Sequence, residues 1–482
     1  LFPLIGRPLQ PYLFVDVKNN YSTTLQLPEY YELKKQMSEL GFSMSFIYSF
    51  FIKSHFFAII KAPFTSVHRL LSLTTNSLMA ISTPKPDIEG PIPPINTSGE
   101  TMDMADFNTY LDTLSKRVYK ADVGLLIDGE EFFSHFILNA NKATHSIFIR
   151  LYIFGADPYA VRLADVLKEK SNEGVQVRLI LDDLNTLLNF KKEPDLTYPK
   201  DFVMPNIKSY LKEDSKVKVR TRPNTWGTFD HSKVIIIDRD LAYTGGMNFA
   251  EEYRYTWHDM MVSLRGPVVG RLVKDFYESW SFVGWGGDYA SLYRQIFSKR
   301  QREQNIEKPG MVDVRLLYTT PGTAQIFHAH LEAIKRAKKR IYIENAYFGD
   351  DRILEGILEA RARGVDVRVI FPSKNDVSVM HKNNIIMANK LFKNGVKVYF
   401  YRGMTHVKAA LYDDWALVGS ANFDKMSLFV NKEMSLGISD EKFVNELETR
   451  LFEKDFANSD LMEEEFDLGL GYHIVQALAA QF

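Results

Sequence analysis

Two stretches of the chain repeat the same reactive side chains at the same spacing. The first runs from Asp230 to Asp238 and the second from Thr405 to Asp413, and both read H-x-K-x-x-x-x-D. The shared residues are His231, Lys233 and Asp238 in the first stretch, and His406, Lys408 and Asp413 in the second. A lone His-x-Lys on a strand is usually surface decoration, but two aligned copies predict a functional pair.

The residue types of the repeated stretch suit chemistry at a phosphodiester. On a strand with alternating side chains, His231 and Lys233 share one face, and His406 and Lys408 do likewise. An ammonium group can neutralise phosphate oxygens in the transition state, and an imidazole can attack phosphorus or carry a proton. Two copies make one complete site, with one histidine as nucleophile and the other as general acid and then base.

A tight turn and an asparagine follow each stretch. Asn248 and Asn422 lie 17 and 16 positions after their histidines, and their amides can hold the non-bridging phosphate oxygens. The turn residues are Gly245 and Gly246 in the first copy, and Gly419 and Ser420 in the second. Glycine lets backbone approach closely, and the Ser420 hydroxyl can add a donor.

The elements that must position these side chains also occur twice. Hydrophobic periodicity predicts the order strand, helix, strand, helix, strand in each copy. In the first copy the ranges are Val123–Ile127, Glu130–Lys142, Ser146–Phe154, Tyr159–Glu173 and Val175–Leu181. In the second they are Val314–Tyr318, Ala324–Lys338, Arg340–Phe348, Arg352–Arg363 and Val365–Phe371. Gly174 and Gly364 end the second helix of each copy. The pattern predicts two pseudo-symmetric α/β sandwich repeats with mixed, largely parallel sheets.

The duplicated motif, with its turn and asparagine, resembles the phospholipase D superfamily over residues 121–460. In that superfamily an acidic residue downstream of each motif orients the histidine. Asp259 lies 28 positions after His231 and Glu433 lies 27 after His406, so these two are the candidates. We expect Asp238 and Asp413 to be structural, binding backbone or a cation behind the strand.

Within the superfamily the chain is most similar to bacterial cardiolipin synthases. The stretches that carry this resemblance are Leu125–Phe133, Ala242–Asn248, Trp257–Asp259, Gly266-Pro267 and Ala416–Asp424. Members of that family transfer a phosphatidyl group from one phosphatidylglycerol to another and release glycerol. The resemblance implies a phosphatidyl-histidine intermediate with an alcohol as acceptor. Two departures leave the lipids open: Asp230-His231-Ser232-Lys233 replaces the usual Asn-His-Arg-Lys, and two N-terminal spanning helices are not evident.

Composition excludes several classes of function. The chain has 59 basic and 60 acidic residues, a net charge of −1, which disfavours a dedicated nucleic-acid binder. Cysteine is absent, so there is no disulfide, thiol nucleophile or Cys-ligated metal. His258 is expected to be non-catalytic. His328 and His330 face different directions on a helix, so a metal site there is a weak prediction. We expect no metal and no cofactor.

Regions outside the repeats divide the chain further. We expect an N-terminal extension at 1–120, repeats at 121–292 and 311–460, a linker at 293–310, and a tail at 461–482. The aromatic stretch 42–64 is either an interfacial membrane helix or a buried helix that covers the repeats. Residues 84–95 have the composition of a proline-rich linker. The first repeat carries 15 more residues between glycine and motif histidine than the second, placed near 191–205. Because the sequence begins with Leu1, we expect a processed or truncated form, which a signal or anchor could have preceded.

We therefore expect a membrane-associated phosphatidyltransferase of cardiolipin synthase type at a bacterial cell membrane, with a phospholipid substrate. His231 is assigned as nucleophile and His406 as acid and base by analogy with two-motif relatives, although near symmetry leaves these roles open. A hydrolytic phospholipase D is the first alternative. A phosphodiesterase acting on nucleic acid and a non-enzymatic protein on an inactive scaffold are further alternatives. Near-neutral charge disfavours the former, and two complete motifs disfavour the latter. The oligomeric state is left open.

Overall fold

The computed structural model describes residues 48–79, 91–189, 202, 204–284, 286–297 and 307–468. Several sequence predictions fall wholly or partly outside these residues: the start of the 42–64 stretch, the proline-rich linker at 84–95, the extra loop at 191–205, the linker at 293–310 and the tail at 461–482.

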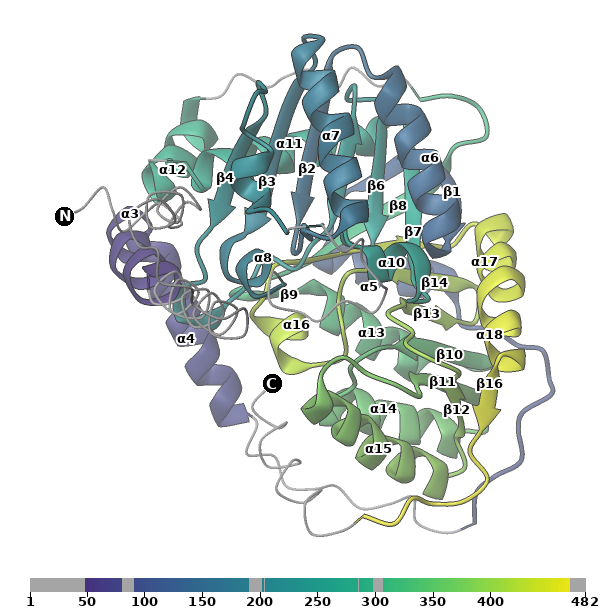
Figure 1. The fold of residues 1–482 in the computed structure, drawn as a ribbon. Helices are drawn as coiled ribbons and strands as arrows, with labels where there is room; N and C mark the ends of the chain where they lie inside the picture. The colour runs from purple at the N-terminus through teal and green to yellow at the C-terminus, as the bar shows by residue number, and fades with distance from the viewer. Residues whose placement is uncertain are drawn as a thin grey trace, which may run out of the picture.

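Both repeats have the predicted order of strand, helix, strand, helix, strand (Figure 1). The first contains β1 (Val118–Ile127), α6 (Asp128–Lys142), β2 (Ser146–Leu151), α7 (Pro158–Asn172) and β3 (Gln176–Asp182). The second contains β8 (Val312–Thr320), α13 (Gln325–Arg336), β10 (Arg340–Asn345), α14 (Asp351–Ala362) and β11 (Asp366–Pro372). The prediction of two matching α/β units is confirmed.

The remaining elements complete each repeat. In the first they are α8 (Asp183–Asn189), α9 (Ile207–Tyr210), β4 (Lys218–Arg222), η3 (Thr225–Gly227), β5 (Val234–Ile237), β6 (Leu241–Gly245), α10 (Glu251–Tyr255), β7 (Met260–Arg265), α11 (Pro267–Phe282) and α12 (Gly287–Phe297). In the second they are β9 (Thr323–Ala324), α15 (Ser378–Lys393), β12 (Lys397–Tyr401), β13 (Lys408–Tyr412), β14 (Trp415–Gly419), α16 (Lys425–Phe429), β15 (Glu433–Ile438), α17 (Glu441–Leu447), η4 (Glu448–Phe452), α18 (Glu453–Ala457) and β16 (Ser459–Leu461).

Equivalent caps begin and end the second helix of each repeat. The Asp157 carboxylate accepts from the backbone N–H of Ala160 at the start of α7, and Asp350 accepts from Ile353 at the start of α14. Such caps satisfy backbone donors that the first helical turn leaves open. Gly174 and Gly364, with φ of +103° and +89°, follow the two helices as predicted.

A single mixed sheet runs through both repeats. Its strand order is β16-β12-β11-β10-β13-β14-β15-β8-β1-β7-β6-β5-β2-β3-β4, with β9 paired to β8. The repeats join where β1 pairs antiparallel with β8, from Val118 opposite Arg315 to Ala121 opposite Val312. Each repeat is thus one half of a continuous sheet.

The expectation of largely parallel sheets is wrong. Within the described residues, parallel pairing between strands is confined to β2-β3-β4 and to β10-β11-β12, and the only other parallel pairs are four isolated bridges. The strands that carry the motifs form antiparallel meanders, β5-β6-β7 and β13-β14-β15. Short turns force antiparallel pairing of β5 with β6 and of β13 with β14, because a parallel pair needs a long crossover.

Helices cover both faces of the sheet (Figure 1). In the first repeat, α6 and α7 bury Phe132 and Leu163 against Ile149 of β2. On the opposite face, α11 and η4 contribute Phe276 and Phe452 to a core that takes residues from both repeats. The two repeats therefore share part of their hydrophobic core as well as their sheet.

The N-terminal extension contributes η2 (Tyr48–Phe57), α3 (Ala58–Lys61), α4 (Pro63–Met79) and α5 (Met104–Leu114). The first three elements lie against the loop that contains η3. Asn224 N donates to Ser54 Oγ at 2.8 Å, and Trp226 Nε1 donates to Ser66 O at 2.9 Å. This confirms a helical extension packed on the first repeat. Among the described residues, no helix combines the length and apolar character needed to cross a bilayer.

Candidate active site

The two motif histidines lie where the repeats meet. Both come just before their strands rather than within them, because β5 begins at Val234 and β13 at Lys408. His231 N donates to Lys432 O at 2.9 Å, and His406 N donates to His258 O at 2.7 Å. Each histidine is therefore fixed by backbone of the other repeat.

These backbone bonds produce crossed pairs of histidine and carboxylate. The Nδ1 atom of His231 lies 2.9 Å from Oε1 of Glu433, and Nδ1 of His406 lies 2.7 Å from Oδ2 of Asp259. The sequence predicts these two carboxylates by counting from the histidine of the same repeat. In the structure each carboxylate contacts the histidine of the opposite repeat.

The two motif lysines are buried beside the imidazoles. Lys233 Nζ donates to His231 O at 2.7 Å, and Lys408 Nζ donates to His406 O at 2.5 Å. Burial lowers the pKa of Lys233 to about 7 and that of Lys408 to about 8. Burial and the two nearby lysines also hold the pKa of His231 well below its usual value. The His231 ring is thus neutral at neutral pH, and the lysines are poised to gain charge when an anion arrives.

The two carboxylates are fully buried as well. Asp259 Oδ1 accepts from Met260 N at 2.7 Å, while Glu433 Oε2 accepts from Ser420 Oγ at 2.5 Å. Burial raises the pKa of Asp259 to about 7 and that of Glu433 to about 8. The Ser420 hydroxyl, expected as a donor to substrate, is instead directed at Glu433.

The turn glycines make room for these carboxylate-bearing strands. A methyl group built on Gly246 would lie 2.1 Å from Asp259 Oδ1. On Gly245 and Gly419 it would lie 2.3 Å from Met260 O and 2.4 Å from Met434 O. Any side chain at these three positions would displace a strand that carries a carboxylate.

The two asparagines differ in their contacts. Asn248 Oδ1 accepts from Ile153 N at 3.0 Å, and its Nδ2 donates to Tyr253 OH at 2.8 Å. Asn422 is buried, and its Oδ1 has no hydrogen-bond partner within the described residues. The near-symmetric motif therefore surrounds an asymmetric site.

Aromatic rings that the sequence does not single out enclose the imidazoles. Tyr152 packs edge-on against His231 with ring centroids 4.6 Å apart, and Lys233 Nζ lies 5.3 Å from the centre of the same ring. The ring centroids of Tyr253 and Trp257 each lie 5.4 Å from that of His406, and the ring centroid of Tyr347 lies 6.4 Å from it. Tyr152 directly follows strand β2, and Tyr347 lies at the corresponding end of β10, so alignment of the repeats could have flagged this region.

Asp238 and Asp413 are the last residues of the two motifs and the first residues of the turns that follow, and their side chains bind backbone N–H groups. Asp238 accepts from the N–H groups of Thr144, His145 and Ser146 at 2.8–2.9 Å. Four N–H groups reach Asp413, those of Met102, Lys338, Lys339 and Arg340. Both aspartates have positive φ, +51° and +49°, a conformation that Asp tolerates better than most residues. They tie each turn to the start of β2 or β10.

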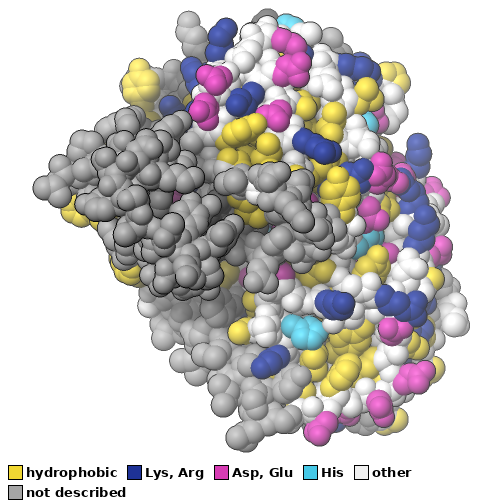
Figure 2. Space-filling view, viewed as in Figure 1, with side chains coloured by type: hydrophobic (Ala, Val, Ile, Leu, Met, Phe, Trp, Pro, Cys, Tyr) yellow, Lys and Arg dark blue, Asp and Glu magenta, His cyan; other side chains and the backbone are white. Residues whose placement is uncertain are grey.

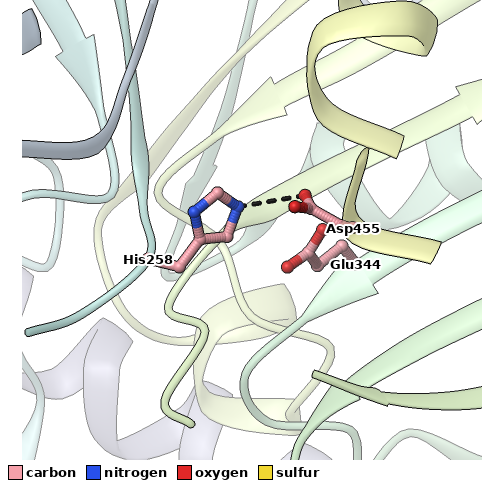
Figure 3. Close-up of side chains that lie close together, drawn as sticks. All are labelled: His258, Glu344 and Asp455. Carbon is pink, nitrogen blue, oxygen red and sulfur yellow. Dashed lines mark hydrogen bonds and ion pairs between the residues drawn. The ribbon is translucent and has the colours of Figure 1, made fainter. Parts of the chain in front are cut away.

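His258, Glu344 and Asp455 form a second polar cluster (Figure 3). His258 Nε2 lies 3.0 Å from Asp455, and its Nδ1 lies 2.7 Å from Asp128. Possible ligand atoms of His258, Glu344 and Asp455 all lie within 4.8 Å of one another, a separation that could hold a metal ion. Both ring nitrogens are already paired with carboxylates, and the hydrogen bonds to those carboxylates raise the pKa of His258 despite its burial. This arrangement suits an imidazolium between two carboxylates. His330, which the sequence analysis considered with His328 for a metal site, is not part of this cluster: its Nδ1 lies 2.7 Å from Tyr412 OH.

Comparison with known proteins agrees with the fold. The family model described as "Cardiolipin synthase, PLD-like domain" matches residues 136–280 and 330–456. The cardiolipin synthase of Listeria welshimeri is 31% identical over 345 residues, covering 69% of this chain and 68% of that protein. Cardiolipin synthase 1 of Bacillus cereus is 29% identical over 352 residues, covering 70% of this chain and 66% of that protein.

A solved structure shares the fold. The phosphatidylserine synthase of Haemophilus influenzae Rd KW20 aligns with a TM-score of 0.59 at 14% identity, covering 78% of this chain and 96% of that one. This likeness concerns the fold alone. The matched family segments contain both motifs, both asparagines and both carboxylates described above. The chain is an enzyme of the phospholipase D superfamily and belongs to its cardiolipin synthase family.

Proposed function

We propose that the protein transfers a phosphatidyl group between two phospholipids through a covalent histidine intermediate. The observation that carries this proposal is the contact between His231 Nδ1 and the buried carboxylate of Glu433. A proton on Nδ1 that points to Glu433 leaves Nε2 with the lone pair. The lowered pKa of His231 keeps that lone pair available, as a nucleophile requires.

In the first step, His231 Nε2 attacks the phosphorus of a phosphatidylglycerol. The P–N bond forms, the P–O bond to the headgroup glycerol breaks, and His406 gives the leaving oxygen its proton. Lys233 and Lys408 carry the positive charge that offsets the developing charge on the phosphate oxygens. In this proposal the Asn422 amide orients the same oxygens. The Asn248 amide, already bonded to Ile153 N and Tyr253 OH, can contribute only its remaining N–H.

In the second step, a primary hydroxyl of another phosphatidylglycerol attacks the phosphorus. His406 takes the proton of that hydroxyl, the P–O bond forms, and the P–N bond to His231 breaks. The products are cardiolipin and the regenerated enzyme. Asp259 orients His406 in both directions of proton transfer, as Glu433 does for His231.

Apolar side chains on the N-terminal elements support binding at a membrane surface. The exposed members include Phe51, Phe56, Ile60, Phe64, Val67 and Leu71. Helix α12 adds Tyr289, whose ring centroid lies 6.4 Å from that of Phe64. A run of exposed aromatic and aliphatic residues is typical of interfacial anchors. Elsewhere, Figure 2 shows basic and acidic side chains interspersed on the visible face.

The decisive experiment is mass spectrometry of the products formed from phosphatidylglycerol vesicles. Cardiolipin with an equimolar amount of glycerol supports transfer. Phosphatidic acid without cardiolipin would make water the acceptor and replace transfer by hydrolysis. Absence of either product, together with cleavage of a nucleic acid, would overturn the lipid substrate.

A further inference from the structure

A pocket separates the N-terminal elements from the first repeat. Its walls come from η2, α3 and α4 on one side, and from β4, the loop after it and the end of α11 on the other. The empty space, including the part that opens to solvent, is about 740 Å³. None of the motif histidines, lysines, asparagines or orienting carboxylates lines it, so it is distinct from the candidate active site.

Four basic side chains line this pocket, and no Asp or Glu does. They are Lys53, Lys61, Arg69 and Arg220. Lys53 and Arg220 have partners that fix them in place. Lys53 lies 2.9 Å from Asp183 and donates to Thr221 Oγ1 at 2.6 Å. Arg220 donates to Trp280 O and stacks 4.2 Å above the Trp280 ring.

Arg69 is the unusual member of this group. Only 3% of its surface is exposed, and its Nε atom has no hydrogen-bond partner. Within the described part of the chain, Arg69 also forms no ion pair. Burial and the neighbouring Arg222 lower its pKa to about 9. By contrast, Arg222 donates to Asp230 at 2.8 Å.

Asp230, Asp182 and Asp288 attract the Arg69 guanidinium from a distance, but none of them forms an ion pair with it. A buried guanidinium with so little direct pairing is stabilised when a ligand supplies hydrogen-bond acceptors and negative charge. The guanidinium of arginine presents a planar fork of donors that matches the oxygens of a phosphate. Ser66, which also has a hydroxyl, lies in the same wall, on the helix that carries Arg69. The neighbouring Thr65 hydroxyl already donates to Asp288 Oδ1 at 2.5 Å. These features point to a phosphate group as the missing partner of Arg69.

The surroundings of the pocket indicate where that phosphate comes from. Phe57 lines the pocket and is 42% exposed, and the exposed Ile60 and Phe64 follow it on the same segment. A ligand with its phosphate on Arg69 would thus have apolar side chains beside its outer part. An anionic lipid has both parts, whereas inorganic phosphate has only the first.

We propose that this pocket binds the phosphate of an anionic phospholipid headgroup at a site separate from the two histidines. The bound lipid attaches the N-terminal elements to the first repeat and to the bilayer at once. The loop at 221–228 joins this pocket to Asp230, the residue before His231, through Arg222. The proposal does not rest on the transfer reaction, since it concerns binding alone.

The substitution Arg69→Met in the full chain tests the proposal. The control is Lys218→Met, which removes one positive charge at an exposed position on β4. Calorimetric titration with short-chain phosphatidylglycerol below its micelle concentration is expected to reveal two classes of site in the wild type. Arg69→Met should weaken one class by about tenfold or more. Lys218→Met should retain both classes, and short-chain phosphatidylcholine should occupy the pocket poorly.

Thermal unfolding without lipid separates a binding residue from a structural one. If Arg69 serves to bind a ligand, the melting temperature of Arg69→Met without lipid should equal that of the wild type or exceed it. Unaltered lipid titration of Arg69→Met would overturn the proposal, as would inorganic phosphate that fully replaces the lipid in the wild type. If Arg69→Met does not fold, Lys61→Met is the second test, because Lys61 is half-buried in the lining of the same pocket. Lys61→Met is then expected to weaken the same class of site, and unchanged binding would overturn the proposal. A failed product assay with intact Arg69-dependent binding would overturn only the transfer reaction.

Discussion

His231 and Glu433 are 202 positions apart in the chain, yet His231 Nδ1 lies 2.9 Å from Glu433 Oε1. His406 and Asp259, 147 positions apart, form the reciprocal pair. Each histidine therefore depends on a carboxylate of the opposite repeat. Neither repeat holds a complete pair of its own.

Crossed pairing predicts which imidazole responds to which carboxylate. Glu433→Gln should perturb the ring-nitrogen NMR signals of His231, and Asp259→Asn those of His406. Each change should lower kcat by roughly 10²–10⁴-fold, since a misoriented histidine loses its correct tautomer. Glu441→Gln, an exposed position in α17, is the matched control. Signals that respond within the same repeat would contradict the crossed arrangement.

The covalent intermediate is expected on His231. Denaturing, alkaline quench followed by peptide mass spectrometry should find a phosphatidyl adduct on the peptide that contains His231. His406→Asn should form that adduct more slowly, because His406 also protonates the leaving glycerol. Once formed, the adduct should persist, because the group that activates the acceptor hydroxyl is gone. His231→Asn should carry no adduct. An adduct on His406 in the wild type would reverse the two roles.

A narrow pH optimum is expected near neutrality. In the free enzyme Lys233 and Lys408 have lowered pKa values of about 7 and about 8, so raising the pH through this range removes the charge that binds phosphate. Asp259 and Glu433 have raised pKa values of about 7 and about 8, so lowering the pH protonates the groups that orient the histidines. The kcat/KM profile should be bell-shaped, with limbs that belong to the coupled cluster.

The alkaline limb should be weaker in kcat than in kcat/KM, because a bound phosphate raises the pKa of both lysines. Steady-state rates measured across this pH range with phosphatidylglycerol check this. A flat kcat/KM profile above neutrality would contradict the role given to the buried lysines.

The two motif aspartates should differ in their effect on stability. Asp413→Ala leaves four backbone N–H groups without their acceptor in a buried turn, so the free energy of unfolding should fall by about 3–5 kcal/mol. Asp238→Ala should lower it by about 1–2 kcal/mol, because the Asp238 side chain is 24% exposed and water can replace it. Denaturant unfolding measures both, with Asp414→Ala in the same turn as control. Equal losses would contradict this account.

Much of this fold could be predicted because periodicity and caps are local. The strand–helix order of both repeats and the glycines after α7 and α14 follow from neighbouring residues. The antiparallel pairing of the motif strands could not be predicted from local pattern, because alternating apolar and polar residues are compatible with either direction of pairing. Fusion of the two sheets through β1 and β8 depends on contacts nearly two hundred residues apart, which no local pattern specifies.

The residues of the candidate site also divide into those that the sequence predicts and those that it does not. The duplicated motif predicts His231, Lys233 and their counterparts as site residues. The similar spacing after each motif predicts Asp259 and Glu433. The exchange of carboxylates between repeats could not be predicted, because spacing along the chain does not say which histidine a carboxylate meets. Tyr152 and Trp257 were missed for another reason: an aromatic residue beside a strand is usually core.

The joined sheet also limits how the enzyme can move. Opening the repeats like a hinge would break the backbone hydrogen bonds between β1 and β8 and tear the core that Phe276 and Phe452 share. Many two-lobed enzymes admit substrate by such a motion, but here the shared sheet and the shared core oppose it. Under the proposed function, the lipid phosphate reaches a site whose two halves stay joined, so its entry depends on movement of the lipid rather than on separation of the repeats.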